Sequence, residues 1–77
     1  MAEPLRVEAG ETDTETVMTA LDEGRRVLVT VPFAGEDHQV TLRFDGETYY
    51  CDTPTTLHKH DTAAEMRTCI EHEGYAE

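Results

Sequence analysis

The chain has 77 residues, of which 17 are Asp or Glu and six are Lys or Arg, so its formal net charge at pH 7 is -11. This length predicts a single domain over residues 1–77, with a core near the lower limit for a stable monomer. The charge argues against nucleic-acid binding, which depends on Lys and Arg neutralising phosphates, and no apolar run reaches the ~20 residues of a membrane span.

The acidic residues are interleaved with apolar residues, which indicates a solvated surface and not a disordered acidic tail. Lys59 is the single lysine. Such a composition favours a salt-rich cytoplasm, because near molar salt the Debye length falls to about 3 Å and carboxylates scarcely repel one another. No basic segment followed by an apolar run is present, so we expect an untargeted, soluble, cytoplasmic protein.

The N-terminal third contains a weak strand pattern followed by a helix. Apolar and polar residues alternate over residues 5–9, which fits either a fourth, edge strand or a segment lying along the surface. Thr12 and Glu15 then have the spacing of a capping box, and Gly24 follows an apolar stripe. We therefore expect a helix that begins after Thr12, packs one narrow face on a sheet and ends near Gly24.

The central stretch, residues 25–51, organises the rest of the chain. Residues 26–31 alternate, with valines on one side, and Pro32 ends the run because proline cannot donate to a strand ladder. Asp45-Gly46 between two further alternating runs is typical of a hairpin with a two-residue loop. These signals predict a three-stranded antiparallel meander.

The predicted pairing around Asp45-Gly46 sorts the side chains onto two faces, because opposed residues share a face. The core face collects Val40, Leu42, Phe44, Tyr49 and Cys51. The other face is polar except for Leu28 and Tyr50, and residues 26–31 would offer an open edge. These two exposed apolar residues, together with the small core, predict a homodimer that uses Leu28 and Tyr50 as its interface.

The C-terminal part contains a second helix after a turn-rich connection. Residues 52–60 are polar and rich in turn formers, apart from Leu57, which we expect to anchor the connection to the core. Thr62 and Glu65 form another capping box, and Gly74 provides a stop. The expected class is α+β, with two helices packed on one face of the meander.

Five zinc-capable side chains lie within 22 positions of one another: Cys51, His58, His60, Cys69 and His72. Cys69 and His72 have the i, i+3 spacing that places two ligands on one helical surface. However, helical angles put His72 opposite the apolar stripe and away from core-facing Cys51, and no C-x-x-C pair is present. We therefore expect a core cysteine and solvated histidines, no cofactor, and metal binding as the alternative function.

Two further chemistries are compatible with the residues but less favoured by them. A disulfide between Cys51 and Cys69 is geometrically compatible with the predicted fold, but cytosolic thiols are normally reduced. His58-x-His60 beside Asp61 resembles an acid/base pair, but such a polar turn also holds histidines without a catalytic role. Since no phosphate-binding loop or serine elbow is present either, we expect a protein that is not an enzyme.

Residues 46–76 resemble small, acidic, functionally uncharacterised proteins found in haloarchaea. The resemblance rests on the YYCDTP turn at residues 49–54 and on the H-x-H-D pattern at residues 58–61, before the second helix. It implies a halophilic archaeal cytoplasm and no particular activity. The resulting hypothesis is a non-enzymatic interaction module that acts as a homo-oligomer or binds a further protein partner.

Overall fold

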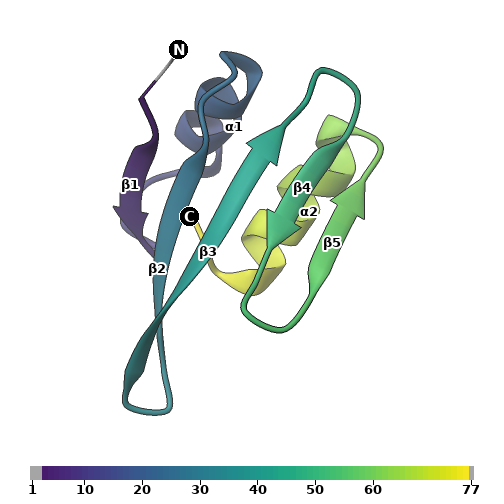
Figure 1. Ribbon diagram of the computed structural model, residues 1–77. Coiled ribbons are helices and arrows are strands. Elements are labelled where there is room, and N and C mark those ends of the chain that lie inside the picture. The colour runs from purple at the N-terminus through teal and green to yellow at the C-terminus, as the bar shows by residue number, and fades with distance from the viewer. Residues whose placement is uncertain (1–2, 77) are drawn as a thin grey trace.

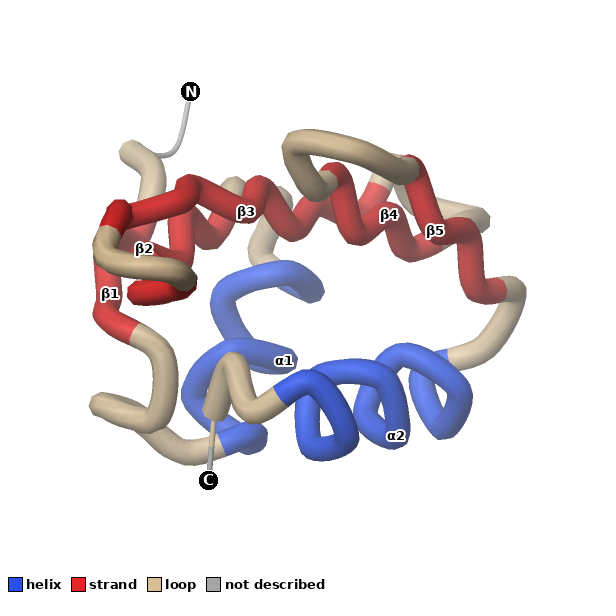
Figure 2. The backbone as a smooth tube through the Cα atoms, turned by 90° about the horizontal axis from the view of Figure 1, so that it is seen from below, coloured by secondary structure: helices blue, strands red, loops and turns tan. Residues whose placement is uncertain are grey.

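In the computed structural model, which describes residues 3–76, one mixed sheet carries both helices on a single face (Figure 1, Figure 2). The strands, in spatial order across the sheet, are β1 (Leu5–Glu8), β2 (Val27–Phe33), β3 (Glu36–Phe44), β4 (Tyr49–Asp52) and β5 (Leu57–His60). The helices are α1 (Thr14–Asp22), between β1 and β2, and α2 (Ala63–Glu73), after β5. The class is α+β, as predicted.

The sheet is larger than the predicted meander. That meander corresponds to β2, β3 and β4, which pair antiparallel. β1 pairs with β2 in parallel, because α1 carries the chain back across the sheet between them. β5 pairs with β4, so residues 58–60 form a strand and not a polar turn. Within the described residues β1 and β5 are the edges, and the prediction that β2 offers an open edge was wrong.

The loop between β3 and β4 has four residues, not two. Phe44 pairs with Tyr49, because the Asp45 carboxylate organises a wider turn. Its Oδ1 accepts hydrogen bonds from the backbone amides of Glu47 and Thr48, each at 2.8 Å. The predicted register was therefore wrong by two residues. Since side chains alternate with a period of two, the predicted core face is nevertheless correct.

Both helices begin at a side-chain cap. The side chain of Thr62 accepts from the Glu65 amide at 3.1 Å, which confirms the predicted start of α2. At α1 the cap is Asp13 and not Thr12, with the Thr16 amide 2.7 Å from the Asp13 carboxylate. The capping-box prediction there was wrong by one residue.

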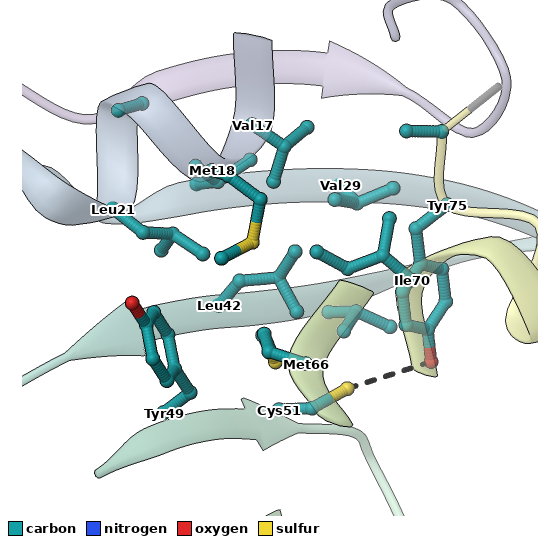
Figure 3. Close-up of a cluster of buried hydrophobic side chains, with 14 residues drawn as sticks. Val17, Met18, Leu21, Val29, Leu42, Tyr49, Cys51, Met66, Ile70 and Tyr75 are labelled. Atoms are coloured by element: carbon teal, nitrogen blue, oxygen red, sulfur yellow. Dashed lines mark hydrogen bonds between the residues drawn. The ribbon is translucent and has the colours of Figure 1, made fainter. Parts of the chain in front are cut away.

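The core lies between the sheet and the helices (Figure 3). Its largest fully buried side chains are Leu21, Leu42, Met66, Ile70, Val17, Val27, Val29 and Cys51. Tyr49 ties the two layers together, since its hydroxyl donates to the Asp22 carboxylate at 2.9 Å. Tyr75 folds back after α2 and is buried against the same core.

Candidate functional site

A groove opens between β5 and α2, at one edge of the two layers. Its cavity volume is about 500 Å³, and its polar lining consists of His58, His60, Glu65, Thr68, Cys69, His72 and Glu73. We refer to it as the histidine groove. Imidazole, thiol and carboxylate groups are all represented in it, which is the donor set that borderline transition metals prefer.

Strand pairing explains why two histidines point into this groove. His58 pairs with Cys51 and His60 pairs with Tyr49. Because opposed residues share a face, both histidines lie on the side of the sheet that the helices cover. The prediction that residues 58–60 form a solvated turn was wrong, because it did not place the two histidines on the helix-covered side of the sheet. Leu57 was expected to anchor the connection to the core, but it is 46% exposed and lies on the opposite side of the sheet.

The α2 side of the groove follows from helical spacing. Glu65, Cys69 and His72 are separated by four and three residues and so line one face of the helix. His72 is exposed, as predicted. It nevertheless lines the same groove as His58 and His60, which reach the groove from β5. The groove thus gathers four of the five candidate ligands.

The histidines differ in their surroundings. His58 and His72 are exposed, whereas the Nε2 atom of His60 is buried without a hydrogen-bond partner among the described residues. A buried nitrogen of this kind can accept a metal ion or a proton donor. Within residues 3–76, however, no three His, Cys, Asp or Glu side chains are placed to hold a metal ion together as they stand. Coordination in the groove would require side chains to rotate.

Cys51, the fifth candidate ligand, lies in the core behind the groove. It is fully buried, as predicted, and its thiol donates a weak hydrogen bond to the Tyr75 hydroxyl at 3.7 Å (Figure 3). Burial raises the pKa of Cys51 to about 12. Burial also raises the pKa of Cys69, which is half-buried and reaches the groove. Both cysteines are therefore thiols at neutral pH.

A second surface with a distinct composition is the side of the sheet that no helix covers (Figure 2). We call it the outer face, and away from the tip of the β2–β3 hairpin it consists of Arg6, Glu8, Leu28, Thr30, Gln39, Thr41, Arg43, Tyr50, Asp52, Leu57 and Lys59. Both predicted interface residues lie on it and both are half-buried. The outer face carries three cations and two carboxylates, unlike the acidic chain as a whole.

The Tyr50 ring is held in a fixed orientation on this face. The Arg43 guanidinium lies over it, 4.0 Å from the ring centroid. The Tyr50 hydroxyl donates to the Asp45 carboxylate at 2.9 Å. Stacked Tyr and Arg side chains are typical anchors of protein interfaces, since they present a large rigid surface at low entropic cost.

The fold and these two surfaces define a small two-layer α+β protein with a polar groove at one edge and a bare sheet face. No helix in the described part of the chain is long and apolar enough to cross a membrane. The chain belongs to DUF8001, a family of unknown function, which matches residues 1–77. No curated protein and no solved structure matches the chain.

Proposed function

We propose that the protein is a non-enzymatic interaction module that binds a second copy of itself through the outer face. The observation that carries this proposal is the charge of that face. Seventeen acidic residues and six basic ones make two copies of the chain repel each other. Away from the hairpin tip, the outer face carries three cations and two carboxylates, so two copies repel each other less through this face than the net charge of the chain implies.

Shape and chemistry support the same surface. Leu28, Tyr50 and Leu57 provide apolar contact area between threonines, and sheet faces pack on each other at about 10 Å. A two-fold axis would apply the same patch to itself, so that Arg43 of one copy could meet Asp52 of the other. β2 plays no part as an edge in this contact, since it is paired on both sides.

Sedimentation equilibrium in molar potassium chloride tests the dimer. We expect twice the chain mass at micromolar concentration, and a monomer for the variant that combines Leu28→Glu with Tyr50→Glu. A matched control adds the same charge elsewhere, by Thr16→Glu with Thr19→Glu on the exposed side of α1, and should remain dimeric. A wild-type monomer throughout this range, or a folded double variant that stays dimeric, would show that the outer face is not the interface.

The histidine groove supports a second candidate function, the binding of a divalent transition metal. The observation that favours it is the convergence of His58, His60, Cys69 and His72 on one cavity, with an unpartnered His60 nitrogen. Such an ion would bind to a folded protein, because the groove lies outside the core formed by Leu21, Leu42 and their neighbours. Chelation should therefore leave the protein folded and lower the melting temperature only by the stabilisation that the bound ion contributes.

Zinc titration of protein purified without an affinity tag tests this candidate. We expect one equivalent to bind, and the combination of His58→Ala with His60→Ala to abolish binding. The control His38→Ala, on β3 and outside the groove lining, should leave binding intact. Retention of zinc by the double histidine variant would place the metal elsewhere. Zinc that survives dialysis against chelator and is needed for folding would make it structural, contrary to the proposal.

We also propose that the protein works in a salt-rich cytoplasm. The support is the net charge of -11 on 77 residues and the resemblance of residues 46–76 to haloarchaeal proteins. At molar salt the repulsion between two such chains is screened within about 3 Å, which also favours the dimer.

A further inference from the structure

The two cysteines of the chain lie next to each other at the boundary between the histidine groove and the core. Cys69, on α2, is half-buried and lines the groove, and Cys51, on the inner side of β4, is fully buried behind it. α2 packs on β4, and Cys69 packs against the buried cluster that contains Cys51, so the two thiols meet in the same part of this interface and each affects the pKa of the other. We propose that they form a reversible oxidation site, at which a hydroperoxide entering the groove converts the two thiols into a disulfide between α2 and β4.

The chemistry assigns a different role to each cysteine, because solvent reaches only one of them directly. The Cys69 thiolate attacks the peroxide O–O bond, forming a sulfenic acid on Cys69 and releasing an alcohol, or water from hydrogen peroxide. The Cys51 thiol then attacks the sulfenic sulfur, the S–S bond forms, and water leaves with the Cys51 proton. Two thiols and one hydroperoxide thus give one disulfide, one alcohol and one water.

This pair is suited to slow oxidation and not to rapid turnover. The thiolate is the reactive species, and burial raises the pKa of both cysteines. The groups that face the pair are Glu65, His72 and Glu73 on α2, His58 and His60 on β5, and Tyr75 beyond Cys51. The negative charge of Glu73 adds to this effect of burial, because it disfavours a thiolate at either sulfur.

Oxidation would also change the contact that holds the C-terminal residues. The Cys51 thiol hydrogen is the donor to the Tyr75 hydroxyl, and the disulfide removes that donor. The backbone carbonyl of Tyr75 in turn accepts from the Gly10 amide at 3.2 Å, beyond β1. The redox state of the pair is therefore linked to the packing of Tyr75 after α2 and, through Tyr75, to the contact with Gly10 after β1.

The full chain treated with hydrogen peroxide tests the proposal. We expect the intact mass to fall by two hydrogen atoms, both thiols to become unreactive toward alkylation, and non-reducing peptide mapping to show a Cys51–Cys69 link within one chain. A dithiol reductant should restore both thiols. Disulfides found only between chains, or oxidation of Cys69 beyond sulfenic acid while Cys51 stays a free thiol, would overturn the proposal.

Single-cysteine variants separate the two roles. With Cys51→Ser, or Cys51→Ala if serine destabilises the core, Cys69 should accumulate a sulfenic acid that a dimedone probe traps. With Cys69→Ser, the buried Cys51 should stay a thiol at the same peroxide dose. Rapid oxidation of Cys51 in the absence of Cys69 would contradict the order of events.

Discussion

The two ends of the sheet are built differently, although each is covered by one helix. At the β1–β2 end, the nine-residue α1 buries Thr14, Val17, Met18, Ala20 and Leu21. At the β4–β5 end, the eleven-residue α2 buries Met66 and Ile70 alone. We call these ends the closed half and the open half.

The difference extends to the strands beneath the helices. In the closed half the inward positions of β2 include Val27 and Val29, both fully buried, followed by the half-buried Val31. In the open half the inward positions of β5 are His58 and His60, and a groove remains where a core would otherwise continue. The stability of the fold is therefore concentrated in one half, while its reactive side chains are concentrated in the other.

The largest expected effect comes from making the same substitution in each half. Leu21→Ala removes a fully buried side chain and leaves a cavity, which should lower the free energy of unfolding by about 2–5 kcal/mol. In the monomer, Leu57→Ala removes the same atoms from a 46% exposed position on the outer face of β5 and should lower the free energy of unfolding by at most about 0.5 kcal/mol. Urea denaturation in high salt measures both values. Similar losses for the two variants would show that the halves do not differ in this way.

Dilution of salt should affect the open half first. Lowering the salt from about 1 M to about 10 mM extends the Debye length from ~3 Å to ~30 Å, so that the carboxylates repel one another across the molecule. α2 carries Glu65, Glu71 and Glu73 and has few buried residues to offset this repulsion. We expect hydrogen exchange to rise in α2 before α1, and the melting temperature to fall. An unchanged melting temperature would remove the main support for adaptation to salt.

The smallest expected effect is a difference between the two helix caps in acid. Hydrogen bonds from Thr16 hold the pKa of Asp13 below its ordinary value of 3.8. The ionised cap therefore stabilises α1 above about pH 3.8, and this contribution is lost as the pH falls through the lower value of the folded state. The Thr62 hydroxyl that caps α2 does not titrate, so its contribution does not depend on pH. Thr62→Ala should lower the free energy of unfolding by about 1 kcal/mol at any pH.

Amide hydrogen exchange measured during acidification checks this difference. The protection of the Thr16 amide, taken relative to its intrinsic exchange rate at each pH, should fall in acid, and Asp13→Asn should remove that dependence. The Glu65 amide, bonded to Thr62, serves as the internal reference. Equal acid sensitivity at both caps would mean that global unfolding, and not the Asp13 cap, governs the response.

The sequence predicted the inner strands β3 and β4 better than the edge strand β5, for physical reasons. Alternating valines and leucines have one stable arrangement on a sheet that faces helices, so the core face from Val40 to Cys51 could be predicted even with a wrong register. β5 has no such signal, since three of its four residues are charged or imidazole side chains. Its strand character depends on pairing with β4, which is a tertiary effect.

One signal for β5 was nevertheless present. Thr53-Pro54-Thr55-Thr56 forms a four-residue turn in which the Thr53 hydroxyl oxygen accepts from the Thr56 amide at 2.9 Å. Proline at the second position and a hydroxyl residue at the first are typical of such turns. A hairpin there would have placed His58 opposite Cys51 and predicted the groove. The convergence of α2 on that groove, in contrast, depends on helix docking and could not be read from local pattern.

The single parallel pairing in the sheet has a consequence for how the chain folds. Each hairpin joins strands that are close in sequence, whereas the pairing of Leu5 with Val27 must close a loop that includes all of α1. Loop closure makes such non-local contacts slower to form. We therefore expect β2 to β5 to associate first and β1 to dock last, so that substitutions at Val7 accelerate unfolding and leave the folding rate nearly unchanged.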